Sequence, residues 1–130
     1  MLPTDAKARK AVPLYSGLLR YFPDALAEVA ELSRIGNEQH NPGTPLHWDR
    51  TKSTDELDAL MRHLLDAGTY DTDKVAHSTK VAWRALANRQ KEIEAERRAD
   101  EQTTAINNYP AHWQNIQSTL QNSNMKRYEK

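Results

Sequence analysis

Four carboxylates in the first half of the chain have a spacing that could bind a divalent metal ion. Glu28 and Glu31 are three positions apart, and so are Asp55 and Asp58. On a helix, residues three apart are neighbours on one face. Two helices that pack antiparallel could therefore bring both pairs together, and their oxygens would suit Mg²⁺ or Mn²⁺ beside water and phosphate ligands. The alternative is that these acids form the solvated faces of amphipathic helices.

One neighbour of the first pair favours a buried or functional face. Ile35 falls on the same helical face as Glu28, Glu31 and Glu38, and an isoleucine is unexpected inside a purely solvated stripe. The face is therefore a better candidate for a site than an arbitrary pair of acids would be.

The segment between the two acidic pairs, QHNPGTPLHWDRTK, gathers aromatic and basic side chains between two prolines. Loops held by a rigid scaffold commonly carry function. Trp48 could stack on a purine base, or it could be an apolar plug that ties the loop to the core. Arg50 and Lys52 could contact phosphate, because both carry cations that bind it.

Cations and histidines also occur on the later helical segments. Lys80 and Arg84 share a face with His77, so they could line a triphosphate site or lie in solvent. His63 and His77 are treated as hydrogen-bonded structural residues, because the chain has no adjacent His-Asp pair of the kind found in histidine–aspartate metal hydrolases.

Composition limits the class of protein. The chain has 130 residues, 18 basic and 18 acidic side chains, and no cysteine. This length suits one domain, the balanced charge disfavours bulk nucleic-acid binding, and disulfides and thiolate zinc sites are excluded. We find neither a signal-peptide pattern nor an apolar run of roughly 20 residues, so we expect a cytoplasmic protein.

The apolar residues recur at helical spacing, and the pattern predicts an all-α bundle of three main helices plus a C-terminal tail. A first helix begins at Pro23 and continues to the breaker sequence HNPGTP. A second runs from about Thr54 to Ala67, with a capping box formed by Ser53 and Glu56.

A third predicted helix is capped within Asp71–Asp73 and continues to about Arg98. Its apolar stripe consists of Val75, Ala82, Leu86 and Ile93. We place the domain at residues 1–100 and a polar tail at 101–130. Within the tail, Trp113, Ile116 and Leu120 have helical spacing, so a docking helix and disorder both remain open.

The run KAVPLYSGLLRYFPDALAEVAELSRIGNEQHNPGTPLHWDRTKSTDELDALMRHLLDAGTYDTD, followed by HSTKVAWRALA, resembles the phage dATP/dGTP diphosphohydrolase family. This family is related to the MazG-like all-α nucleotide pyrophosphohydrolases. The likeness covers roughly residues 10–94 and is most specific in IGNEQHNPG, LHWDR and RHLLDAG. It implies a MazG-like fold and an enzyme of the host cytoplasm that hydrolyses dGTP or dATP to the monophosphate and pyrophosphate. It also implies a Mg²⁺ or Mn²⁺ cofactor and a homodimer or homotetramer.

The resemblance also implies roles for particular residues. In the MazG-like group an ExxE pair and an ExxD pair hold the metal, and these match Glu28 with Glu31 and Asp55 with Asp58. The chain departs from the pattern because Ala27 stands where a doubled glutamate is usual and the second pair begins with aspartate. The candidate catalytic residues are Glu38, as a proton acceptor or replacement ligand, and Lys52. The candidate substrate-binding residues are His40, Asn41, Trp48, Arg50, Arg62, Lys80 and Arg84.

Two other functions remain open. A phage protein that sequesters a purine nucleotide signal or effector would need Trp48 and the basic residues but not the acids. A helical adaptor would instead use its Asn-rich tail to bind a partner.

Overall fold

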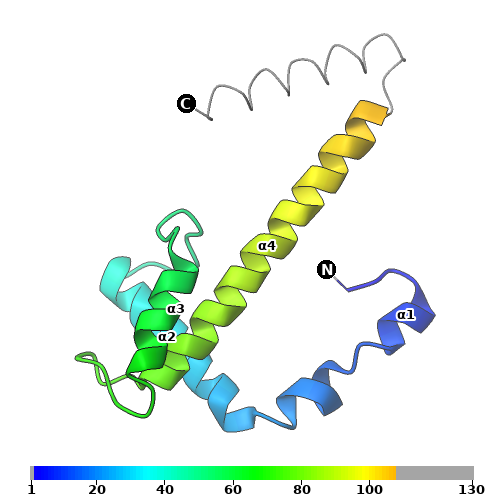
Figure 1. The fold of residues 1–130 in the computed structure, drawn as a ribbon. Coiled ribbons are helices and arrows are strands. Elements are labelled where there is room, and N and C mark those ends of the chain that lie inside the picture. The colour runs from blue at the N-terminus through cyan, green and yellow to red at the C-terminus, as the bar shows by residue number, and fades with distance from the viewer. Residues whose placement is uncertain (1, 108–130) are drawn as a thin grey trace, which may run out of the picture. The chain divides into compact units, whose positions relative to one another are not determined.

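The structure, a computed structural model, describes residues 2–107, and within this range it is helical, as predicted (Figure 1). The elements are α1 (Ala6–Lys10), the π-helix η1 (Tyr15–Leu19), α2 (Pro23–His40), α3 (Glu56–Leu65) and α4 (His77–Asn107). The described residues form no strand, only an isolated antiparallel bridge between Tyr70 and Ala76. None of the described helices is long and apolar enough to cross a membrane. The predicted docking residues Trp113, Ile116 and Leu120 lie outside the described range.

The first predicted helix is confirmed as α2. Pro23 occupies its first turn, where a missing N–H costs nothing. The helix ends at His40, and the N–H of Asn41 donates to the carbonyl of Asn37. The breaker sequence then turns the chain through Gly43, whose φ of +73° is a left-handed conformation that glycine adopts easily. The helical segments α1 and η1 were not predicted.

The second predicted helix exists as α3, but its predicted capping box is wrong. Asp55 is the N-cap and makes no side-chain capping hydrogen bond. Ser53 instead donates its hydroxyl to Asp55 Oδ1 at 3.2 Å. Glu56 is the first helical residue and not the third, and its buried carboxylate pairs with Arg84.

The third predicted helix begins later and ends later than predicted. Residues 69–77 first form a turn, in which the Asp71 N–H donates to Val75 O and the His77 N–H to Thr69 O. Lys74 adopts a left-handed φ of 63° within it. The helix α4 then starts at His77 and continues through Asn107, beyond Arg98 and into the first residues of the predicted tail.

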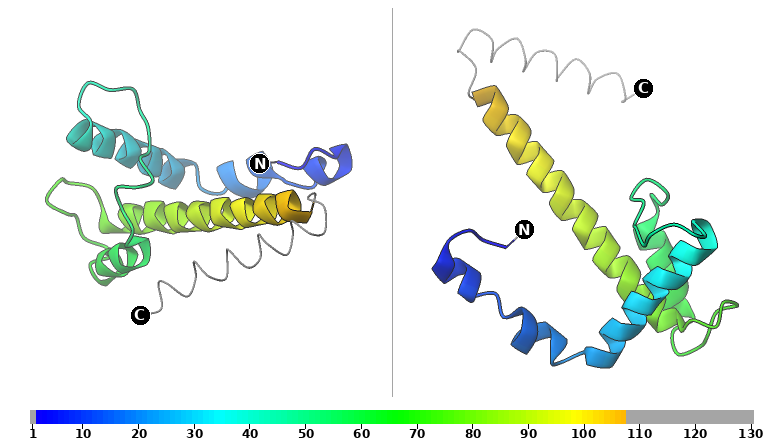
Figure 2. Two further views of the ribbon diagram at one scale, coloured as in Figure 1. Left: turned by 90° about the horizontal axis from the view of Figure 1, so that it is seen from above. Right: turned by 180° about the vertical axis from the view of Figure 1, so that it is seen from behind.

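The chain divides into two compact units, residues 1–88 and 89–130. In the first unit, α2 and α3 lie beside the first turns of α4 (Figures 1 and 2). Among the described residues the buried apolar side chains are Ala59 and Ala87, so this core is small. The predicted apolar stripe of α4 is not the buried face, because Leu86 remains 57% exposed while Thr79 and Ala87 are buried.

The described part of the second unit is the segment 89–107 of α4. Arg89 forms ion pairs there with Glu92 and Glu96 along the helix. Such exposed pairs stabilise a helix only slightly.

Candidate functional site

Hydrogen bonds between side chains join α2 to α4. The Thr79 hydroxyl donates to Glu28 Oε2 at 2.7 Å, and the Trp83 indole N–H donates to Ser33 Oγ at 2.9 Å. Glu28, a predicted metal ligand, therefore faces a helix that the sequence analysis had not placed beside it. Its carboxylate keeps lone pairs for a further partner, because a carboxylate offers about four acceptor sites.

The other three predicted ligands lie elsewhere. Glu31 accepts three hydrogen bonds from Arg34, which hold the pKa of this exposed carboxyl below its usual value. Asp55 pairs with Arg62 at 2.7 Å. Asp58 is exposed on α3. Within the described part of the chain, no three of these four acids bring ligand oxygens within 4.8 Å of one another. Within a single chain, these four acids therefore do not form a metal site.

The loop after α2 is organised by Asn37, a buried residue that the sequence analysis did not single out. Its side-chain amide donates to Thr44 O at 3.1 Å, and its Oδ1 accepts the backbone N–H of His47 at 3.4 Å. An asparagine within an otherwise amphipathic helix gave no distinctive signal for this role. The loop is also closed by Lys52, which donates to Asn41 Oδ1 at 2.9 Å.

Trp48 lies edge-to-face on Trp83, with ring centroids 5.6 Å apart, and Arg50 lies 4.4 Å above its ring. This is the geometry of a plug that ties the loop to α4, one of the two alternatives for Trp48. Glu38, His40, Arg50 and Lys52 remain exposed. The predicted catalytic residues and several predicted substrate-binding residues therefore belong to one end of α2 and the loop that follows it.

The predicted substrate-binding cations of α4 are engaged in ion pairs. Arg84 donates to Glu56 Oε2 at 2.6 Å and to Ser53 Oγ at 3.0 Å. Lys80 donates at 2.7 Å to both Asp71 and Asp73, and its side chain is only 12% exposed.

These contacts change the acidity of all three groups around Lys80. The Lys80 ammonium lowers the pKa of Asp71 and of Asp73 below their usual range. Burial alone would lower the pKa of Lys80, but the hydrogen bonds to the two carboxylates raise it above its ordinary value. Three charged groups are thus held in place beside the start of α4.

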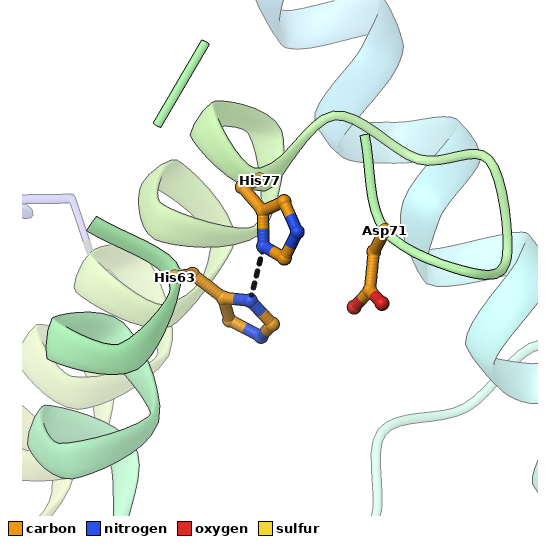
Figure 3. A group of neighbouring side chains, drawn as sticks. All are labelled: His63, Asp71 and His77. Carbon is orange, nitrogen blue, oxygen red and sulfur yellow. Dashed lines mark hydrogen bonds between the residues drawn. The ribbon is translucent and has the colours of Figure 1, made fainter. Parts of the chain in front are cut away.

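A further cluster lies next to this ion pair. His63 of α3, Asp71 of the turn and His77 at the start of α4 bring a ligand atom each within 4.8 Å of one another (Figure 3). The Nδ1 atoms of the two histidines are 2.9 Å apart. Burial, followed by the charge of Lys80, lowers the pKa of His63, which favours its neutral form. The cluster was not predicted from the sequence, because its members are distant in sequence and lie on separate elements.

The observed features define an all-α protein whose basic loop and first turns of α4 are held by hydrogen bonds and ion pairs. The sequence profile described as dATP/dGTP diphosphohydrolase, N-terminal, matches residues 3–102. The chain therefore belongs to the dATP/dGTP diphosphohydrolase family. Comparison with curated proteins and with solved structures gave no significant match.

Proposed function

We propose that this protein hydrolyses dGTP or dATP to the deoxynucleoside monophosphate and pyrophosphate, with Mg²⁺ or Mn²⁺ as its cofactor. The observation that carries the proposal is the family match over residues 3–102. The structure supports a nucleotide ligand through the cations that it leaves exposed at the end of α2 and in the following loop. Arg50 and Lys52 can contribute positive charge to a triphosphate there.

The cations proposed to bind substrate differ in the contact that each would lose on binding phosphate. Lys52 would bind phosphate by releasing Asn41, and Arg62 by releasing Asp55, and both of these contacts are exposed. Lys80 and Arg84 are held by less exposed pairs. We therefore assign direct phosphate contact first to Arg50, Lys52 and Arg62. His40 and Asn41 are further substrate contacts, and Glu38 is the proton acceptor.

Whether the reaction needs a metal ion can be tested without knowing which residues bind the ion. Glu28, Glu31, Asp55 and Asp58 are the proposed acids, yet they do not converge as placed in one chain. Replacing Glu28 by glutamine is a suitable probe, because an amide oxygen can still accept the hydrogen bond from Thr79 while the negative charge is removed.

The decisive experiment incubates the protein with each deoxy- and ribonucleoside triphosphate, with Mg²⁺, Mn²⁺ or a chelator, and separates the products. We expect pyrophosphate and a purine deoxymonophosphate, lost with the chelator and strongly reduced in Glu28→Gln and Glu31→Gln. Glu101→Gln, an exposed change on α4, is the matched control and should retain activity. Release of orthophosphate or tripolyphosphate would contradict the proposed reaction.

The same material tests the sequestration alternative. A sequestering protein would bind purine nucleotide in a calorimetric titration, release no product, and keep its ligand in Glu28→Gln. An adaptor would bind no nucleotide and would lose its activity when residues 101–130 are deleted.

We also propose that the chain assembles with a second copy through α3. Leu57, Met61 and Leu64 lie along one side of α3 and are 47–58% exposed, while few apolar side chains of the described residues are buried. A second copy would remove this apolar stripe from water, where exposed patches mark interaction sites. Sedimentation should show an oligomer that Leu57→Glu with Met61→Glu dissociates, whereas Asp58→Lys on another face of α3 should not.

A further inference from the structure

We propose that His63, Asp71 and His77 form a binding site for a divalent transition-metal ion. The site is separate from the acid pairs of α2 and α3, and it does not depend on the proposed hydrolysis. Its three members come from α3, from the turn before α4, and from the first residue of α4 (Figure 3).

The two histidines already present their nitrogens to each other. Their Nδ1 atoms lie 2.9 Å apart, and the ring centroids are 5.1 Å apart. Two imidazoles on one ion, each about 2.1 Å from it in tetrahedral geometry, would have their nitrogens about 3.4 Å apart. A small separation of the rings therefore converts the observed contact into a pair of ligands.

Asp71 supplies the third ligand atom. Its Oδ1 accepts from both the N–H and the hydroxyl of Thr72, and its Oδ2 accepts from Lys80, so the carboxylate is held beside the rings. Each carboxylate oxygen has two lone pairs, so Oδ2, which accepts a single hydrogen bond, keeps one for an ion. Hydrogen bonds to a ligating carboxylate are typical of metal sites, because they orient the ligand.

The local charge favours a cation in spite of Lys80. Asp71 and Asp73 together carry two negative charges against the one positive charge of Lys80. These three side chains therefore sum to a net charge of −1 before an ion binds. A dication would be attracted, and the pairing of Lys80 with Asp73 can persist while Asp71 binds the ion.

The ligand types determine which ions fit. Two imidazoles with one carboxylate suit Zn²⁺, Co²⁺, Ni²⁺ or Mn²⁺, whereas Mg²⁺ and Ca²⁺ prefer sites made wholly of oxygen. The proposed site should therefore bind Co²⁺ and Zn²⁺ tightly, Mn²⁺ more weakly, and Mg²⁺ hardly at all.

The test uses the full chain, freed of metal with a chelator, and Co²⁺ as the probe. Co²⁺ titration at pH 7.5 should produce visible absorption bands that saturate at one ion per chain, and Zn²⁺ should displace them. His63→Gln and His77→Gln should each weaken Co²⁺ binding at least tenfold, and Asp71→Asn severalfold. His47→Gln is the matched control, since this exposed loop histidine lies outside the cluster, and its affinity should equal that of the unaltered protein.

A measurement on the unaltered protein avoids any loss of folding in the variants. Substoichiometric Co²⁺ should shift or broaden the ring-proton NMR signals of two of the five histidines, which the two glutamine variants assign to His63 and His77. Absence of saturable Co²⁺ binding, or full binding in both His63→Gln and His77→Gln, would overturn the proposal. Neither result would alter the product analysis that tests hydrolysis.

Discussion

The indole N–H of Trp83 donates to Oγ of Ser33 across fifty positions of sequence, and this 2.9 Å bond joins α4 to α2. The serine hydroxyl in turn donates to the carbonyl of Val29 at 3.3 Å. The bond is therefore part of a short chain that ends on the backbone of α2.

The first prediction concerns this bond. Trp83→Phe removes the donor but keeps an aromatic ring against Trp48, and Ser33→Ala removes the acceptor. Each change should lower the free energy of unfolding by about 1 kcal/mol or more. In urea denaturation the double variant should lose less than the sum of the two. Strict additivity would mean that the bond contributes no stability.

The second prediction concerns the pair of Glu56 and Arg84. The Glu56 side chain is 4% exposed and that of Arg84 27%, so replacing Arg84 removes a cation from beside a poorly hydrated carboxylate. Arg84→Gln should therefore lower the free energy of unfolding by about 2–3 kcal/mol. This value is small for the loss of a buried ion pair, because Arg84 keeps some contact with water. Arg62→Gln, which breaks an exposed pair on α3, is the control and should change the melting temperature much less. Equal effects would contradict the importance of burial.

The third prediction concerns the left-handed backbone at Lys74. A φ of 63° is unfavourable for a residue with a Cβ, and glycine adopts it freely. Lys74→Gly should therefore raise the free energy of unfolding by about 0.5–1 kcal/mol, measured by thermal denaturation. Lys74→Ala keeps the Cβ and should give no such gain. A lower stability for the glycine variant than for the alanine variant would show that the turn is not strained there.

The fourth prediction concerns pH. Arg62, followed by Ser53, holds the pKa of Asp55 below its usual value. A carboxyl whose folded-state pKa is lowered contributes stability above its unfolded pKa of about 3.9, and loses it as pH falls through the lower folded-state pKa.

Between pH 6 and pH 3 the melting temperature should therefore fall slightly more for the unaltered protein than for Asp55→Asn. The difference is small because both partners are exposed. Asp58→Asn on the same helix is the comparison variant. An Asp55→Asn variant with the steeper pH dependence would contradict the assigned direction.

The elements that could be predicted from the sequence are those with strong local signals. Pro23 and the sequence HNPGTP mark both ends of α2, because proline and glycine act through local backbone geometry. The capping box at Ser53 and Glu56 failed because the N-cap is Asp55, and the Glu56 carboxylate pairs with Arg84 of another helix. Local spacing cannot show such a competitor.

The same contrast between local signals and tertiary contacts applies to the candidate site. Spacing alone singled out Glu28 as a candidate ligand, but its hydrogen-bond partner Thr79 is fifty-one positions away and gave no signal. The apolar stripe through Leu86 predicted a helix that exists, but it predicted the wrong buried face. Trp83, with its hydrogen bond, and the small Ala87 pack inward instead. The cluster of His63, Asp71 and His77 depends on how three elements meet, which periodicity does not encode.

The edge-to-face contact of Trp48 with Trp83 has an optical consequence. Two indoles 5.6 Å apart and inclined by 73° couple their electronic transitions, which gives near-ultraviolet circular dichroism a signal that depends on their mutual orientation. Because one indole belongs to the loop and the other to α4, the unlabelled protein carries a reporter of loop movement that can be followed in real time as nucleotide or metal is added.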